Sequence, residues 1–320
     1  MPRVRDAWHH DCVTDRFDLT LLIPAYNEAK RLDDGVARLR ATADEGHVDL
    51  GATEIIFIDD GSTDGTGDVA RAIAGDLPHA AVITQPTNQG KGAAIRSGIF
   101  AAHGRKVVFM DADLAIDPSH LPELVGALDR SPIAVGSRAD GRHIDYGSRI
   151  RTDAGRTFNA LVHLTAGISL TDTQCGFKGF RRGPALLLAH LQTTSGYAFD
   201  VELLWLAHRL SLGIEEVPVT WVDVAGSTVS VARDSVRMLV DLVRASRRRR
   251  WMVLCDVTDS VPDDLPDATV VLTHAGGTTL CGPVSGLGAM RRAVGLSGSF
   301  HIGDLSDLAS LAPFDVTPTV

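Results

Sequence analysis

Lys106-Val107-Val108-Phe109-Met110-Asp111-Ala112-Asp113 is the stretch that decides the fold. Its apolar part has the pattern of a short strand buried on both faces, and two acids follow directly. Similar apolar runs come before it and after it, and helical patterns lie between them. We expect strands at 19–23, 54–58, 81–84, 106–110 and 133–136, and helices at 28–43, 66–74, 91–103 and 118–129. This alternation predicts an α/β fold with a mostly parallel sheet and helices on both faces.

The rest of the chain changes character twice. Helical periodicity is expected at 151–166, 199–210 and 235–246, with a strand at 215–221. Beyond residue 250 the chain contains neither Lys nor Glu, is acidic and is rich in Gly, Thr and Ser, with one strand expected at 268–273. We therefore predict a flexible leader at 1–18, one α/β domain at 19–250 and an acidic C-terminal appendage of unassigned role at 251–320.

Composition excludes several classes of protein. The net charge of -9 argues against a nucleic-acid binder, which would carry a basic surface. No apolar run in the sequence reaches the roughly 18–20 residues that span a bilayer. The N-terminus has no apolar core of the kind found in a signal peptide. The four cysteines show no metal-binding spacing, which favours free thiols in a reducing cytoplasm.

Polar residues follow three of the predicted strands, where open α/β sheets bind their ligands. The three groups are Tyr26-Asn27-Glu28, Asp59-Asp60, and Asp111 with Asp113. The last two carboxylates could share Mg²⁺ or Mn²⁺ with a substrate diphosphate, because these cations prefer oxygen ligands. The alternative is that Asp113 or Asp117 caps the next helix.

Two Gly-containing loops add to this edge. In the loop from Asp59 to Thr66, Asp60 is our candidate for recognition of a base or ribose, and Asp64 is our candidate for a helix cap. A simple turn explains the same residues. The loop from Asn88 to Gly92 would bring backbone N–H groups and the Lys91 ammonium near an anion. The spacing of a Walker loop and of a dinucleotide-binding G-x-G-x-x-G loop is absent from the sequence.

Taken together, these motifs resemble the family 2 glycosyltransferases of the GT-A fold. The resemblance rests on 22–28, 59–66, 88–92 and 111–113. Four later segments resemble the dolichyl-phosphate β-glucosyltransferase branch within the polyprenyl-phosphate glycosyltransferases; they are 136–138, 172–178, 198–204 and 216–221. The similarity covers about 19–250 and does not extend to the appendage. It implies a GT-A, Rossmann-like sheet. Nucleotidyltransferases share this architecture, but their Gly-rich N-terminal loop is replaced here by Pro24 to Glu28.

The resemblance also implies roles for individual residues. The donor-binding residues would be Pro24, Tyr26, Glu28, Asp60, Lys91, Asp111, Ala112 and Asp113, and Asp111 and Asp113 would also hold the metal. The acceptor or phosphate-binding residues would be Arg138, Arg151 and Lys178, with a surface salt bridge as the alternative for Arg151. Gln174 would lie near the metal or sugar. Asp200 would contact the sugar or act as a base, unless it only complements a helix N-terminus. The catalytic candidates are Asp200, Gln174 and Arg138.

The function implied is inverting, metal-dependent transfer of a hexose, with UDP-glucose favoured over a GDP-sugar, to a polyprenyl phosphate. One alternative is a soluble small-molecule acceptor, and another is a non-catalytic sensor of nucleotide sugars. We expect a cytoplasmic protein. Residues 235–250 combine an apolar face with Arg residues, so they form either a peripheral membrane contact or a helix that closes the domain.

Overall fold

The structure is a computed structural model, and it describes 17–113, 115–138, 143–144, 168, 170–222, 240–241, 244–245, 252–257, 270–274, 277–283, 298–303, 305–311 and 314–318. The predicted helix at 151–166, residue Arg151 and most of the predicted helix at 235–246 lie outside these residues. None of the described helices is both long enough and apolar enough to cross a membrane.

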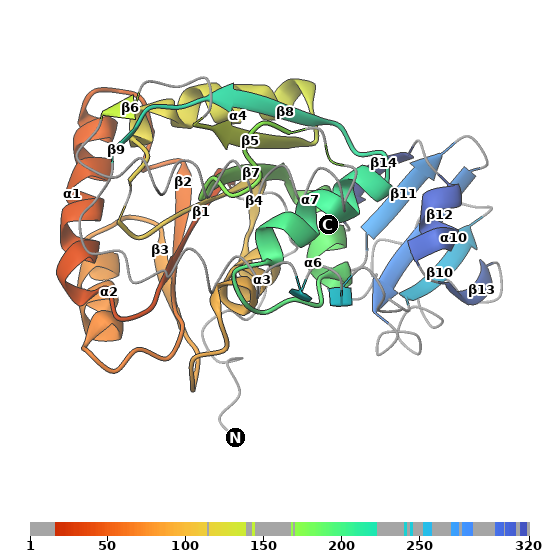
Figure 1. Ribbon diagram of the computed structural model, residues 1–320, viewed down its shortest axis with the longest axis horizontal. Coiled ribbons are helices and arrows are strands. Elements are labelled where there is room, and N and C mark those ends of the chain that lie inside the picture. The colour runs from red at the N-terminus through yellow and green to blue at the C-terminus, as the bar shows by residue number, and fades with distance from the viewer. Residues whose placement is uncertain are drawn as a thin grey trace.

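The main sheet has seven strands in the order β3-β2-β1-β4-β7-β5-β8 (Figure 1). Its strands are β1 (Phe17–Ala25), β2 (Thr53–Asp59), β3 (Ala80–Thr84), β4 (Gly104–Met110), β5 (Ile133–Ser137), β7 (Phe177–Arg181) and β8 (Ile214–Pro218). Neighbouring strands run parallel except at β7, which is antiparallel to both β4 and β5. The predicted mostly parallel sheet is confirmed, and β1, β2 and β4 lie side by side with their carboxyl ends at one edge.

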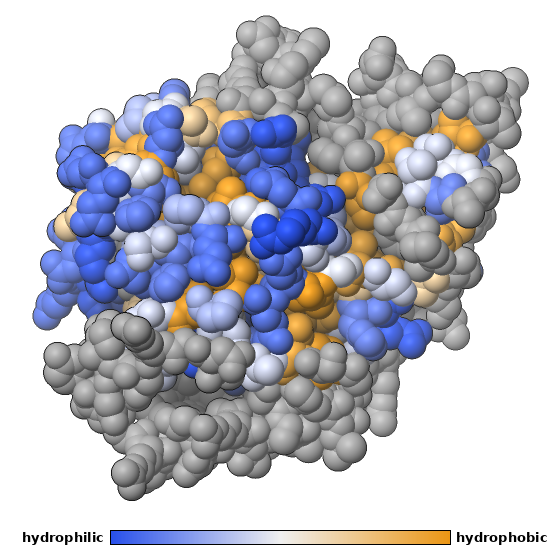
Figure 2. Space-filling model, turned by 90° about the horizontal axis from the view of Figure 1, so that it is seen from above, coloured by the Kyte–Doolittle hydropathy of each residue, from blue (hydrophilic) through white to orange (hydrophobic). Residues whose placement is uncertain are grey.

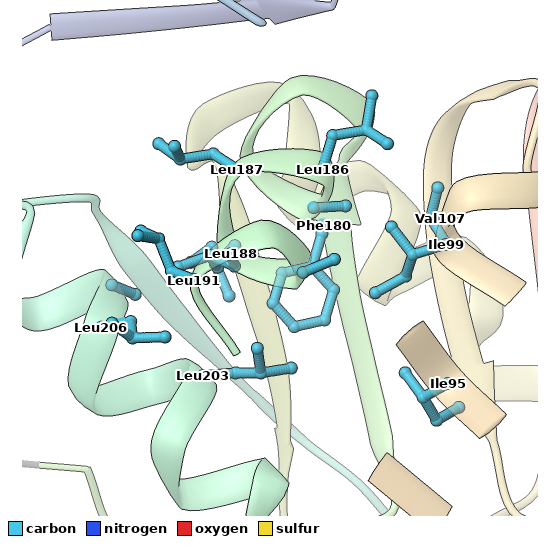
Figure 3. Packing of buried hydrophobic residues seen from close by; sticks show 14 of the residues in the cluster. Ile95, Ile99, Val107, Phe180, Leu186, Leu187, Leu188, Leu191, Leu203 and Leu206 are labelled. Atoms are coloured by element: carbon cyan, nitrogen blue, oxygen red, sulfur yellow. The ribbon is translucent and has the colours of Figure 1, made fainter. Parts of the chain in front are cut away.

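Alternate residues of each central strand face opposite layers of helices. Leu21 and Ile23 pack with α1 (Ala29–Asp44), α2 (Thr66–Gly75) and α4 (Leu121–Arg130). Leu22 and Phe109 pack with α3 (Lys91–Ala101), α6 (Arg182–Leu191) and α7 (Phe199–Arg209). Figure 3 shows side chains of α3, α6 and α7 gathered around Phe180 of β7. Burial on both faces explains why these strands read as continuous apolar runs.

Three local features differ from the sequence-based expectation. The pair β7–α6 was not predicted, because β7 begins inside a polar motif and is short. The expected helix at 118–129 starts instead as a 3-10 turn (Pro118–His120), in which Asp117 accepts a hydrogen bond from the Ser119 amide at 2.9 Å. The expected strand at 215–221 divides into β8 and β9 (Trp221–Val222), and β9 pairs with β6 (His143–Ile144). Pro218, which has no N–H, ends β8.

The C-terminal residues form a second, antiparallel sheet in the order β13-β10-β12-β11-β14. Its elements are β10 (Met252–Val257), β11 (Val270–His274), β12 (Gly277–Pro283), β13 (Gly298–Gly303), α10 (Leu305–Ser310) and β14 (Phe314–Pro318). Buried Leu254, Leu272 and Leu308 belong to the same hydrophobic cluster as α6. Hydrophobic residues also show between the main body and this sheet in the view from above (Figure 2). The division of the chain at residue 250 stays a prediction.

Candidate active site

The carboxyl ends of β1, β2 and β4 border a cleft of about 380 Å³. Its lining includes eight predicted donor-site residues, namely Pro24, Tyr26, Glu28, Asp60, Lys91, Asp111, Ala112 and Asp113. The sequence placed these residues after strands, apart from Lys91 at the start of a helix, and the sheet order makes those strand ends neighbours. The volume of the cleft and the polarity of its lining suit a small-molecule site. Their individual roles stay predictions.

The loops after β1 and β2 hold each other in place. The Asn27 side chain accepts from the Thr63 amide at 3.0 Å, and the Glu28 amide donates to the Thr66 hydroxyl at 2.8 Å. Asp64 accepts from the amide of Ala29 at 3.2 Å and from that of Thr66 at 3.0 Å. Asp64 therefore binds the first residue of α1 as well as the first residue of α2. This bracing leaves Tyr26 about half exposed at the cleft.

Asp60 connects the cleft to the loop before α3. Its two carboxylate oxygens accept hydrogen bonds from the amides of Gln89 and Gly90, both at 2.8 Å. Burial raises the pKa of Asp60, and the two amide donors only partly oppose this effect. The loop that was expected to offer N–H groups to an anion therefore directs two of them to Asp60.

Asp111 and Asp113 bring negative charge to the far end of the cleft. Burial and the nearby charge of Asp111 raise the pKa of Asp113. Burial and nearby carboxylates also raise the pKa of Glu28, although Arg31 opposes this effect. Arg38 donates to the Asp113 carbonyl oxygen at 2.7 Å and fixes the backbone there. A cation would relieve the repulsion between these carboxylates.

A metal at this position would need ligands from its substrate. Among the described residues, no group of three or more His, Cys, Asp and Glu side chains is arranged to hold an ion. Two carboxylates with open access to the cleft instead fit a hard divalent cation that completes its coordination with phosphate oxygens. The donor set of Asp111 and Asp113 is therefore compatible with Mg²⁺ or Mn²⁺.

Behind Asp111 lies a series of charged side chains of alternating sign. Lys91 pairs with Asp111, and Lys178 Nζ lies 3.1 Å from an oxygen of Asp200. Burial alone would lower the pKa of Lys91, but Asp111 and Asp200 raise it above its ordinary value. Burial raises the pKa of Asp200 in spite of its two lysine neighbours. The order Asp111, Lys91, Asp200, Lys178 runs from the cleft into the core.

The structure gives Lys178 a different position from the one expected. Its side chain is fully buried, and its ammonium donates to the Cys175 carbonyl oxygen at 2.5 Å. It therefore has no exposed surface to offer a phosphate, because β7 places it inside the sheet. Asp200 is likewise buried and does not line the cleft.

Asp111 also borders a second, smaller hollow of about 60 Å³. Arg138 lines it, held by two hydrogen bonds to Asp172 at 2.6 and 2.9 Å and lying 5.8 Å from the centre of the Trp221 ring. Gly176 also lines it, and a side chain there would collide with the Asp111 carboxylate. Gln174 lies in the same segment and is half-buried. Its backbone N–H donates to the Asp172 carboxylate at 3.2 Å.

Four cleft residues were not anticipated from the sequence: Arg31, Ala94, Gly196 and Tyr197. Tyr197 comes from the loop between α6 and α7, and α6 itself had not been predicted. Three cysteines, Cys175, Cys255 and Cys281, are buried free thiols, while Cys12 lies outside the described residues. Burial raises the pKa of Cys175 to about 12, which favours a packing role.

Comparison with known proteins places this geometry in context. Residues 20–186 match the family described as glycosyl transferase family 2. A dolichyl-phosphate beta-glucosyltransferase of Trichomonas vaginalis is 34% identical, over 73% of this chain and 73% of its own. The enzyme of that name from Saccharomyces cerevisiae is 34% identical, over 70% and 73%, and the one from Homo sapiens 37%, over 65% and 68%.

Solved structures show the same fold. Glucosyl-3-phosphoglycerate synthase from Mycobacterium tuberculosis, in complex with Mn²⁺, UDP and phosphoglyceric acid, superimposes with a TM-score of 0.54 at 21% identity. The match covers 89% of this chain and 98% of that one.

Proposed function

The chain belongs to glycosyl transferase family 2, in the branch of the dolichyl-phosphate β-glucosyltransferases, and from this premise we propose that it transfers glucose from UDP-glucose to a polyprenyl phosphate with inversion. The observation that carries the proposal is the position of Asp111. This carboxylate borders both the 380 Å³ cleft and the smaller hollow that contains Arg138. A donor diphosphate and an acceptor phosphate would thus meet at Asp111.

The order of strand ends supports an orientation for the donor. Asp60 follows β2, Tyr26 follows β1 and Asp111 follows β4, and these strands are adjacent. The nucleoside would lie by Tyr26 and Asp60, and the diphosphate by Asp111 and Asp113. Arg138 follows β5 on the other side of β7, so its guanidinium would lie beyond the sugar. Arginine suits this position because it binds phosphate with two parallel hydrogen bonds.

The reaction would be a single displacement. An acceptor phosphate oxygen forms a bond to the anomeric carbon while the bond from that carbon to the UDP oxygen breaks, and UDP carries away the electron pair. Asp111 and Asp113 would hold Mg²⁺ or Mn²⁺, whose positive charge stabilises the departing diphosphate. Lys91, paired with Asp111, would add a second positive charge there. Inversion follows from attack on the face opposite the leaving group.

Proton transfer is not required when the acceptor is a phosphate. A phosphate monoester has a second pKa of about 6 and is already an anion near neutral pH. We therefore assign Asp200 a positioning role: its buried carboxylate faces Lys91 and Lys178 and fixes the ammonium that pairs with Asp111. A hydroxyl acceptor would need a base instead.

Contact with a membrane is a further part of the proposal. Val240 and Arg244, in the predicted segment 235–250, are both exposed. Each Arg near an anionic surface contributes about 1 kcal/mol to binding, so this segment could hold the enzyme at its lipid substrate. Co-sedimentation with anionic liposomes at low salt tests this point, and protein left entirely in the supernatant contradicts it.

The central experiment is a donor and acceptor matrix. The protein is incubated with Mg²⁺ or Mn²⁺, each of several UDP- and GDP-sugars, and either a polyprenyl phosphate in detergent or a soluble phosphate ester. Nucleoside diphosphate release and the anomeric configuration of the product are measured. UDP release only with UDP-glucose and polyprenyl phosphate supports the proposal. Turnover only with a soluble acceptor refutes the lipid part, and binding without turnover favours a sensor.

A further inference from the structure

Exposed aromatic side chains gather at the cleft. Among the described residues, the exposed large hydrophobic side chains are Tyr26, Phe100, Tyr197 and Val240. Two of them, Tyr26 and Tyr197, line the cleft and are 45% and 50% exposed. Tyr26 follows β1 at the nucleoside end. Tyr197 comes from the loop between α6 and α7, so it reaches the cleft from a different direction.

The loop that carries Tyr197 is firmly held. Glu202 is fully buried and accepts from the Thr193 amide at 3.0 Å, the Thr193 hydroxyl at 2.7 Å and the Thr194 amide at 2.7 Å. Gln192 donates to the carbonyl oxygens of Gly92 at 2.9 Å and Thr194 at 2.7 Å. The three bonds from Thr193 and Thr194 satisfy the buried carboxylate of Glu202, which would be costly to bury without hydrogen-bond partners. Because the loop is already ordered, ligand contact with Tyr197 costs little conformational entropy.

A further bond holds the Tyr197 loop against the first turn of α3. The Ser195 carbonyl oxygen accepts from the Ala93 amide in the first turn of α3 at 3.2 Å. Gly90 and Gly92 allow this approach, since a Cβ on Gly90 would lie 2.5 Å from that oxygen and one on Gly92 would lie 2.6 Å from Phe199 Cβ. Lys91, which pairs with Asp111, is in this same turn.

We propose that the exposed ring of Tyr197 contacts the hexosyl ring of the nucleotide-sugar donor. The inference rests on the proposed function, and it assigns this side chain to the sugar and not to the nucleoside. An aromatic face offers apolar contact to the C–H groups of a sugar ring, and Tyr197 presents a half-exposed ring at the cleft from a loop that hydrogen bonds hold in place. Tyr26, which follows β1, would contact the nucleoside.

Calorimetric titration with UDP and with UDP-glucose, both with Mn²⁺ and without acceptor, separates the two halves of the donor. Tyr197→Ala should weaken UDP-glucose binding about three- to tenfold and leave UDP binding within about twofold of the wild type. Tyr197→Phe, which keeps the ring, should bind both ligands like the wild type. Phe100→Ala is the matched control, because Phe100 is 43% exposed and does not line the cleft.

The outcomes are distinct. An equal loss of UDP and UDP-glucose binding in Tyr197→Ala would place the ring at the nucleoside and overturn the inference. Unchanged binding of both ligands would overturn it as well, and so would a Phe variant that behaves like Ala. A wild-type protein that binds neither ligand would instead refute the proposed donor and, with it, this inference. Thermal unfolding of each variant confirms that the fold is intact.

Discussion

Lys178 and Asp200 form an ion pair inside the protein, with 3.1 Å between the Lys178 ammonium nitrogen and a carboxylate oxygen of Asp200. Both side chains are buried, and Lys178 also binds the Cys175 carbonyl oxygen. The pair stands behind Lys91, which in turn pairs with Asp111 at the cleft. Two residues expected to meet substrate are thus buried, and neither lines the cleft.

Removing one member of this pair should be costly. Lys178→Met leaves the Asp200 carboxylate buried without its ammonium partner, and we expect a loss of about 3–5 kcal/mol in the free energy of unfolding. Lys178→Met combined with Asp200→Leu should recover most of the loss, since an apolar pair leaves no charge unpaired. Urea unfolding monitored by circular dichroism measures both. A double variant as unstable as the single variant would contradict the pairing.

The metal assignment depends on Asp113. Asp113→Ala should lower metal-stimulated UDP release by about 100-fold or more, because a ligand to the cation at the leaving group is lost. The midpoint of thermal unfolding should stay close to that of the wild type. Asp34→Asn, an exposed acid of α1 that does not line the cleft, is the control. Full activity of Asp113→Ala would remove the metal site from this position.

Asp172 orients Arg138 in the smaller hollow. Asp172→Asn should raise the KM for the acceptor about tenfold or more and change the KM for UDP-glucose little, because the guanidinium loses its charged partner. Equal changes in both KM values would show that Arg138 does not act on the acceptor side. Steady-state kinetics with each substrate varied in turn measures the two effects.

The ion pair between Arg138 and Asp172 should make the stability of the protein depend on pH. Burial would raise the pKa of Asp172, but the hydrogen bonds and charge of Arg138 bring it below its ordinary value of 3.8. Its contribution is therefore fully present above about pH 3.8 and is lost as the pH falls from there through the folded-state pKa. The stability difference between wild type and Asp172→Asn should narrow over that range in chemical unfolding. A stability difference between the two proteins that grows on acidification would contradict a lowered pKa of Asp172.

Glycine at position 92 allows α3 to meet the loop that carries Tyr197. In Gly92→Ala the added Cβ would lie 2.6 Å from Phe199 Cβ and 2.7 Å from the Thr194 carbonyl oxygen. We expect a loss of about 1–3 kcal/mol in unfolding free energy and weaker UDP-glucose binding. Gly126→Ala is the matched control, since nothing lies within 4 Å of a Cβ there, and it should be neutral or stabilising. Equal stability of the two variants would refute the close packing.

Strand and helix positions in the first half were predictable, since the apolar runs and helical periodicity that set them are local. Residues at the ends of β1, β2 and β4 could be assigned to one site because parallel strands end at the same edge. β7, by contrast, was hidden inside a polar motif, and α6 and the Tyr197 loop were hidden with it. Their packing depends on partners far away in the chain, such as Gly92 and Phe109.

The sequence by itself determined the α/β alternation, the eight polar and small residues at the cleft, and the family, because these depend on local pattern and on motifs with fixed spacing. Only the tertiary structure decided what lies behind and beside them. It turned Lys178 inward to Asp200, placed Arg138 with Asp111 in a smaller hollow and brought the Tyr197 loop to the first turn of α3. The physical reason is that burial and charge pairing are set by contacts between distant segments, and a linear pattern contains no distances between them.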